Sequence, residues 1–419
     1  MLGNPNYVLS LVLAFALGFV AVLAMPLGVA VKRVQTAAPA PVLAPKPPRQ
    51  TTQPVMQAAI MHTGSIPRVQ PVVKAKPVQR ARPAREPARQ ISIASLLQRA
   101  DVRAFSSYID PYRSKWSSPP RTKLVSLASA PFPYSGIVPR TRRPFLNHRD
   151  GERVGRKTRS GRVYWADHTY NDNRALLHIP REYDKTKPGV MVLFFHGHGA
   201  TLARDVVVRQ QLPAQISGSG INAVLVAPQF AVNARDSSAG NFWKPGGARR
   251  FLDEAAQQMA KMIDDPDMAQ KFARMPVVIV GYSGGYVPTA ATLARGKLGE
   301  RVKGVVLLDG LYGEFGRFAD WIQNTRSGFF LSAYATSTRK GNAALKGILR
   351  KRGVNYSNSL SSSLRPGSVT FVKAVDSHRD YVTRAWARNP ISDLLSRIPG
   401  TAPALDSTQS AALAEPLKN

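Results

Sequence analysis

The chain has 419 residues and contains no cysteine, and this absence limits its chemistry. It excludes disulfide bonds, catalysis by a thiolate and metal sites with cysteine ligands. For the same reason, cysteine usage does not report the redox compartment of the protein.

Acidic residues are also few, with 25 Asp and Glu against 58 Lys and Arg and a formal net charge of +33. Such an excess predicts attraction to polyanions, for example anionic lipid head groups, cell-envelope polymers or nucleic acid. The basic residues are spread along the chain beyond residue 31 rather than gathered in one stripe. This distribution argues against a dedicated nucleic-acid-binding module, so we expect no nucleic-acid partner.

Charged side chains are missing from residues 1–31, and residues 7–31 form an apolar run that ends at Lys32 and Arg33. A run of this length can span a bilayer as a helix, which predicts a signal anchor or signal peptide over residues 1–33. Small residues at 28–30 suit a signal peptidase, but no positively charged region precedes the run. Cleavage of this segment therefore stays open.

The composition divides the rest of the chain. Residues 34–90 are rich in proline, alanine and scattered cations, which predicts a disordered basic linker. Prolines interrupt residues 91–150, where we expect an irregular strap. Residues 151–400 form the expected main domain, and residues 401–419 a disordered tail.

The orientation in the membrane has two alternatives. Lys32 and Arg33 favour a cytoplasmic main domain, whereas a spacer after an anchor suits the outer side. We favour the inner membrane with the main domain in the periplasm.

Apolar runs typical of buried strands alternate with helical patterns from residue 151 onward. Residues 171–173 carry a turn signal that joins the first two of these runs. The alternation predicts an α/β fold with a mostly parallel central sheet flanked by helices, which binds its ligand at the carboxyl ends of the strands. The expected strands are 163–165, 175–180, 190–195, 221–227, 277–280, 302–308, 329–333 and 369–375, and the expected helices include 250–263 and 287–295.

Residues 277–285 contain the most informative motif, four β-branched residues that lead into Gly281-Tyr282-Ser283-Gly284-Gly285. A buried strand, a Gly-x-Ser-x-Gly turn and a helix in this order are the context of a nucleophile elbow. The strand and helix backbones nearly touch at such a turn, so the positions two before and two after the serine require small residues. Gly281 and Gly285 meet this requirement. The turn would expose the hydroxyl of Ser283 above the sheet.

Residues 160–395 resemble the α/β-hydrolase family at this elbow and at two further places. His196-Gly197-His198-Gly199 ends a buried strand and is similar to the family's His-Gly-x-Gly oxyanion loop. His378 follows the last expected strand. It is the only histidine C-terminal to Ser283, and it matches the family's general base.

The resemblance implies that Ser283 is the nucleophile and that backbone N–H groups of Gly284 and of His198 or Gly199 form the oxyanion hole. It implies no cofactor. A metal pair at His196 and His198 is the alternative, and the lack of a third histidine at ligand spacing argues against it.

The triad acid is harder to identify. The family usually places it after the seventh strand, but residues 321–375 contain no Asp or Glu. Asp309, at the end of the preceding expected strand, is where some family members carry the acid, and we favour it. Glu314 and Asp376 remain rivals, and Asp309 has the alternative role of capping the next helix.

These features lead to the hypothesis of a membrane-tethered serine hydrolase that cleaves carboxylic esters, on small molecules or polymers, through an acyl-enzyme; an amide substrate stays open. Residues 177–199 are similar to the opening of polysaccharide-linked acyl esterases and polyhydroxyalkanoate depolymerases. The short connection from 308 to 329 leaves little room for a lid. Tyr282 and Tyr286 flank the nucleophile, and the aromatic candidates to line a pocket are Phe230, Trp243, Tyr312 and Trp321.

A second hypothesis is a non-catalytic envelope protein with the same fold that binds a polyanion through its basic linker. The vacant acid position after the seventh strand supports it.

Overall fold

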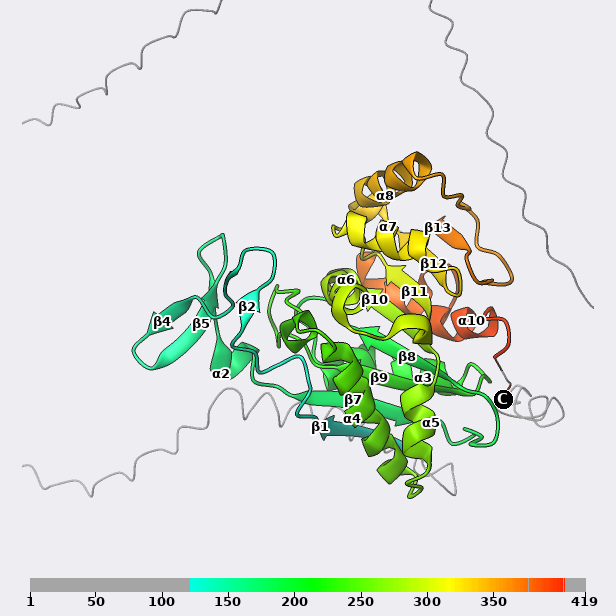
Figure 1. Cartoon of the computed structure of the whole chain (residues 1–419), viewed down its shortest axis with the longest axis horizontal. Coiled ribbons are helices and arrows are strands. Elements are labelled where there is room, and N and C mark those ends of the chain that lie inside the picture. Colours follow the sequence, from blue (N-terminus) through cyan, green and yellow to red (C-terminus); the bar gives the residue numbers. More distant parts are fainter. Residues whose placement is uncertain (1–120, 376, 402, 404–419) are drawn as a thin grey trace, which may run out of the picture. The chain divides into compact units, whose positions relative to one another are not determined.

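The computed structural model describes residues 121–375, 377–401 and 403 (Figure 1). The expected signal anchor, the linker and the tail beyond 403 lie outside these residues, as does Asp376. In the described part of the chain, no helix is both long and apolar enough to cross a membrane.

An eight-stranded sheet forms the centre, in the order β1-β7-β9-β8-β10-β11-β12-β13 (Figure 1). β1 and β7 are antiparallel, as are β7 and β9, and every other neighbouring pair is parallel. The expected mostly parallel sheet is therefore confirmed. Its strands are β1 (Arg121–Ser126), β7 (Arg174–Ile179), β8 (Val190–Phe195), β9 (Ala223–Pro228), β10 (Val277–Tyr282), β11 (Val302–Leu308), β12 (Phe329–Tyr334) and β13 (Val369–Lys373).

Helices cover both faces of this sheet. Along β11, Val305 and Leu307 pack into one hydrophobic cluster, and Val306 and Leu308 into the other. Because both faces are buried, the strands read as continuous apolar runs. The first cluster includes α4 (Gly247–Met262), α5 (Met268–Arg274), α6 (Tyr286–Arg295), α7 (Phe315–Asn324) and α8 (Arg339–Lys351), and the second includes η1 (Leu202–Arg209), α3 (Leu212–Ser217), α9 (Tyr381–Arg384) and α10 (Pro390–Ser396).

Strand pairing connects the two sides of the boundary expected at residue 150 between strap and main domain. β1 lies on the strap side, yet it pairs residue by residue with β7 as the edge strand of the sheet. A hairpin of β4 (His148–Asp150) and β5 (Arg153–Lys157) also crosses the boundary. The described residues fall in one compact unit, so the described part of the strap belongs to the same unit as the main domain.

The two leading strands expected at 163–165 and 175–180 do not form one hairpin. β6 (Val163–Trp165) pairs with β5 in a separate three-stranded sheet, whereas β7 joins the central sheet. Between them lies the short helix α2 (Ala166–Thr169), and Asp172 accepts hydrogen bonds from the backbone and side chain of Arg174. A small hairpin of β2 (Ile137–Val138) and β3 (Arg143–Pro144) precedes this sheet.

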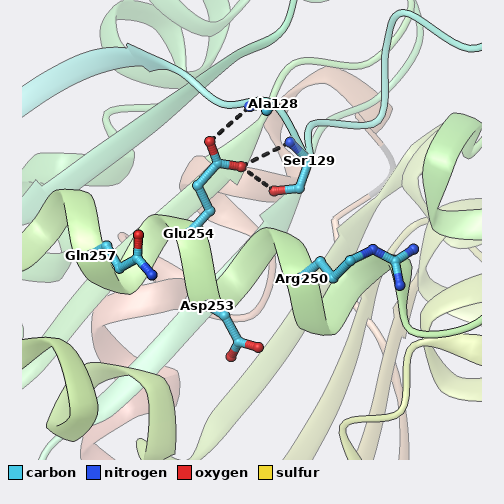
Figure 2. Close-up of a pocket in the computed structure, with 6 residues that line it drawn as sticks. All are labelled: Ala128, Ser129, Arg250, Asp253, Glu254 and Gln257. Atoms are coloured by element: carbon cyan, nitrogen blue, oxygen red, sulfur yellow. Dashed lines mark hydrogen bonds between the residues drawn. The ribbon is translucent and has the colours of Figure 1, made fainter.

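Glu254 on α4 fastens the segment after β1 to the helix layer (Figure 2). Its carboxylate accepts hydrogen bonds from the backbone N–H groups of Ala128 and Ser129, each 2.8 Å long, and from the Ser129 hydroxyl. Burial raises the pKa of Glu254, but these donors outweigh it and lower the pKa below its ordinary value. The three groups border a surface hollow of about 420 Å³ together with Arg250, Asp253 and Gln257.

Glu254→Gln is expected to lower the free energy of unfolding by about 2 kcal/mol, because a neutral amide accepts these bonds more weakly and presents one acceptor oxygen instead of two. Urea unfolding curves would measure the change. Asp253→Asn is the matched control, since Asp253 lies next to Glu254 on α4 and its contact with Arg249 is a 3.7 Å exposed pair. Equal midpoints for the two variants would contradict the role of Glu254.

Candidate active site

The elbow at Ser283 has the strained geometry that its sequence predicts. β10 ends at Tyr282, Ser283 has φ +52°, and the 3₁₀ turn Ser283–Gly285 leads into α6. A Cβ atom at Gly285 would lie 2.3 Å from the carbonyl oxygen of Phe195, and one at Gly281 would lie 2.5 Å from Thr289 Oγ1. Both positions therefore require glycine, although the obstacle at Gly285 is the backbone of β8 rather than that of β10.

Three of the residues singled out in the sequence meet at the carboxyl end of the sheet. Ser283 Oγ lies 2.9 Å from His378 Nε2, and His378 Nδ1 lies 2.5 Å from Asp309 Oδ2. Ser283 follows β10, Asp309 follows β11 and His378 follows β13. The side chain of His378 is 40% exposed and that of Asp309 is fully buried. This is the geometry of a nucleophile, a base and an orienting acid.

Asp309 is held by donors from the end of β12. Its carboxylate accepts hydrogen bonds from the N–H of Ala335, from the hydroxyl of Ser337 at 2.6 Å and from that of Thr338. Burial raises the pKa of Asp309, but the hydrogen bonds from His378 and these three donors outweigh it and lower the pKa to about 2. The carboxylate is thus ionised at neutral pH.

The rival acid Glu314 has another partner. Glu314 accepts a 2.8 Å hydrogen bond from Arg317, and Asp376 is outside the described residues. Asp309 does not cap the next helix, because α7 begins at Phe315 without a side-chain cap. The strand end after β12 holds no acid, as the sequence shows, and supplies donors to Asp309 instead.

Tyr282 holds the other side of His378. The two rings stack with centroids 5.3 Å apart, and the Tyr282 hydroxyl donates a 3.0 Å hydrogen bond to the carbonyl oxygen of His378. Burial raises the pKa of Tyr282 to about 12, so the hydroxyl stays a neutral donor. Tyr282, which flanks the nucleophile in the sequence, is through these contacts a positioning residue for the imidazole.

His196 fixes the start of the expected oxyanion loop. Its Nε2 accepts a 2.9 Å hydrogen bond from the N–H of Phe230, which leaves Nδ1 to donate to the carbonyl oxygen of Gly197 at 2.8 Å. Burial lowers the pKa of His196, in keeping with a neutral ring. Because both ring nitrogens already have partners, His196 and His198 do not form a metal pair in this arrangement.

The N–H of Gly199, one of the two alternatives for the donor from this loop, already has a partner. Its N–H donates a 2.9 Å hydrogen bond to the carbonyl oxygen of Ala234, and its own carbonyl oxygen accepts one from Arg204. Within the described residues, no hydrogen bond engages the N–H of His198 or of Gly284. These two amides remain the candidate donors.

The His198 side chain covers the elbow, and sequence reasoning did not identify its partner. A Cβ atom at Gly284 would lie 2.6 Å from His198 Cδ2, and His198 Nε2 lies 2.5 Å from Ser237 Oγ. Burial lowers the pKa of His198, so a neutral imidazole faces the site. Ser237 is 39 residues away in the chain, and no local signal marks it.

Most of the aromatic residues expected around a pocket belong to the core. Phe230 is buried, and Trp243 and Trp321 pack against the first hydrophobic cluster. Tyr312 is the exception, since it is 45% exposed and its ring lies 6.4 Å from that of His378. Tyr286 lies 6.0 Å from Tyr312. These two rings are the aromatic surface nearest the base.

No protein-family model matches the chain, and no curated protein matches it. Several solved structures are similar to it, although their identities are low and their TM-scores are below 0.5, so these likenesses do not assign an activity. A mutant feruloyl esterase module from Clostridium thermocellum, complexed with sinapinate, has 16% identity and a TM-score of 0.36, with 64% of this chain and 95% of that chain covered.

An IroE-like serine hydrolase from Shewanella oneidensis has 14% identity and a TM-score of 0.33, covering 59% of this chain and 78% of that one. A ferulic acid esterase from Anaeromyces mucronatus, in complex with ferulic acid, has 13% identity and a TM-score of 0.33, covering 71% and 97%. With its sheet order, its elbow at Ser283 and the hydrogen-bonded Ser283, His378 and Asp309, the chain has the architecture of the α/β-hydrolase superfamily and the arrangement of a serine hydrolase.

Proposed function

We propose that this protein is a membrane-tethered serine hydrolase that cleaves carboxylic esters through an acyl-enzyme. The observation that supports it is the unbroken line of hydrogen bonds from Ser283 Oγ through His378 to the buried, ionised Asp309. A serine hydroxyl is a weak nucleophile unless an adjacent base takes its proton, and a base is effective only when a third group orients it.

In the first half of the reaction, Ser283 Oγ attacks the ester carbonyl while His378 Nε2 takes the hydroxyl proton. The negative charge on the carbonyl oxygen is stabilised by the N–H groups of Gly284 and His198, each worth about 3 kcal/mol in sites of this kind. His378 then gives its proton to the leaving alcohol, and the acyl group remains on Ser283.

In the second half, His378 takes a proton from water, which attacks the acyl-enzyme, and returns that proton to Ser283 as the acid leaves. Asp309 keeps the imidazole in the tautomer with a proton on Nδ1 and stabilises the charged ring. Ester is preferred over amide because this fold most often serves esterases, which is an argument by analogy.

The tether is residues 7–31, whose apolar run suits an inner-membrane span with the hydrolase unit on the periplasmic side. The non-catalytic alternative rested on a missing acid after the seventh strand. It loses that support, because Asp309 accepts the hydrogen bond of His378 from the end of β11.

The test is labelling of the full-length protein with a fluorophosphonate, followed by peptide mass spectrometry. We expect a single modified residue, Ser283. Ser237→Ala is the matched control, because Ser237 lies beside His198 in the same site and its removal should leave the labelled peptide unchanged. Folded protein that takes up no label would refute the proposal.

A further inference from the structure

The segment that forms the two small sheets outside the central sheet is strongly basic. Residues 137–165, here called the arginine arm, contain nine Arg and Lys against two Asp and Glu. They form β2, β3, β4, β5 and β6, outside the central sheet (Figure 1). The exposed cations of the arm are Arg140, Arg142, Arg143, Arg149, Arg153, Lys157, Arg159 and Arg162.

Most of these cations have no anionic partner in the protein. Among the described residues, Arg153 is the only one of the eight in an ion pair, with Asp167 at 3.2 Å. Two further acids near the site are already neutralised, Asp236 by Arg156 at 2.9 Å and Glu314 by Arg317 at 2.8 Å. The arm therefore presents uncompensated positive charge to its surroundings.

The arm is attached to the loop that supports the active site. Arg156 pairs with Asp236, and the Tyr164 hydroxyl accepts a 3.2 Å hydrogen bond from the N–H of Arg235. Ser237, the residue after Asp236, is the partner of His198, which covers Gly284. One short loop thus connects the arm to the residue that follows the nucleophile.

Two cations act on side chains that border the catalytic residues. Burial lowers the pKa of His198, Asp236 opposes this effect, and the smaller contribution of Arg235 again lowers the pKa. Burial and Glu314 raise the pKa of Tyr286, and Arg140 opposes them, so the guanidinium lies near this ring. Tyr286 in turn neighbours Tyr312, which faces His378. Neither Arg140 nor Arg235 has an ion pair within the described part of the chain.

We propose that the arginine arm binds a carboxylate-bearing polysaccharide and presents the acyl esters on that polymer to Ser283. This inference rests on the proposed esterase function and assigns its substrate class. Eight of the nine cations are arginines, whose planar fork pairs with carboxylates through two hydrogen bonds. Exposed cations that recur along the arm suit a polymer with a charge on successive units.

Nucleic acid fits the arm less well. Single-stranded nucleic acid needs open aromatic faces on which bases stack. Trp165 is half-buried under the guanidinium of Arg153, which lies 4.4 Å from its ring, and Phe145 is buried beneath Arg156. A lipid surface fits less well too, because Ile137 is the single exposed large apolar side chain of the arm.

The experiment measures kcat/KM of the full-length protein on two polymers of matched length and acetyl content, O-acetylated polygalacturonate and O-acetylated dextran. At low salt we expect about a tenfold preference for the charged polymer, because steering by uncompensated charge raises association rates by at least that factor. In 1 M NaCl, where the Debye length is about 3 Å, the preference should disappear.

The triple variant Arg140→Gln, Arg143→Gln and Arg162→Gln should also lose the preference. A control with the same change in charge, Lys261→Gln, Arg274→Gln and Lys351→Gln, removes exposed cations of other elements and should keep it. Equal kcat/KM values of the wild type on the two polymers, or a preference that survives in the arm variant, would overturn the inference.

The outcomes separate this inference from the proposed function. Hydrolysis of acetylated dextran without a preference defeats the arm proposal alone, whereas a wild type that hydrolyses neither polymer nor an activated small ester defeats both. Arm-dependent binding of single-stranded DNA or of phosphatidylglycerol vesicles, without any polymer preference, would reassign the arm to phosphate groups and overturn the proposal.

Discussion

Ser283→Ala is expected to lower kcat on an activated ester such as p-nitrophenyl acetate by roughly 10⁵- to 10⁶-fold. The reason is that the hydroxyl forms the covalent intermediate, and no other serine occupies the elbow between β10 and α6. Activity that remains would come from substrate binding and from the oxyanion donors. Steady-state kinetics of the wild type and the variant would measure the loss.

The same substitution should leave the fold intact. Ser283 Oγ makes one hydrogen bond, to His378, and a single bond of this kind contributes about 1 kcal/mol. Thermal unfolding followed by circular dichroism would check this point. In Ser237→Ala the hydrogen bond to His198 is lost but the nucleophile stays, so most of the activity should survive. Turnover by Ser283→Ala at the wild-type rate would refute a serine mechanism.

Asp309→Asn is expected to lower kcat by about 10⁴-fold. The amide is close in shape to the carboxylate, but an NH₂ group facing His378 favours the imidazole tautomer with its proton on the wrong nitrogen. It also cannot stabilise the charged ring that forms when Ser283 is deprotonated. Kinetics on the same small ester and the rate of fluorophosphonate labelling should fall together.

Glu314→Gln is the control for this experiment, because Glu314 was a rival for the acid and pairs with Arg317 instead. We expect it to retain most of the activity. If Glu314→Gln were as inactive as Asp309→Asn, or if Asp309→Asn were fully active, the identity of the acid would have to be revised.

The lowered pKa of Asp309 leads to a prediction of how the stability of the fold depends on pH. Its pKa in the folded protein, about 2, is below the value of 3.8 for an ordinary aspartate. The folded state therefore binds this proton less readily, and Asp309 contributes stability above pH 4 that is lost as the pH falls through about 2. Asp309→Asn should remove this part of the acid dependence, which acid unfolding curves would reveal.

Local sequence was sufficient for the elements around the elbow. The bounds expected for β8 and β11 match those observed, because runs buried on both faces have a clear apolar pattern. β1 was missed, since an edge strand with Arg121 and Lys123 exposed carries too few apolar residues to be recognised. Of the arm, β6 was expected, whereas β2, β3, β4 and β5 were missed for the same reason.

Contacts between distant residues account for the remaining differences. Gly199 fits the family pattern, but its N–H is taken by Ala234, a partner 35 residues away that no local motif indicates. Likewise, the donors that lower the pKa of Asp309 come from Ser337 and Thr338, after the next strand. Sequence order was enough to favour Asp309 and to single out His378, but not to find what holds them.

The loop that carries the candidate oxyanion donor His198 is held by hydrogen bonds without a bound substrate. Both nitrogens of His196 have partners, and Gly199 is hydrogen-bonded at its N–H and at its carbonyl oxygen. The conformational entropy of this loop is therefore lost during folding and not during each turnover. Binding of a transition-state analogue should in consequence carry little entropic penalty from the protein. The hydrogen bonds to the oxyanion then contribute to affinity without a cost for ordering their donors.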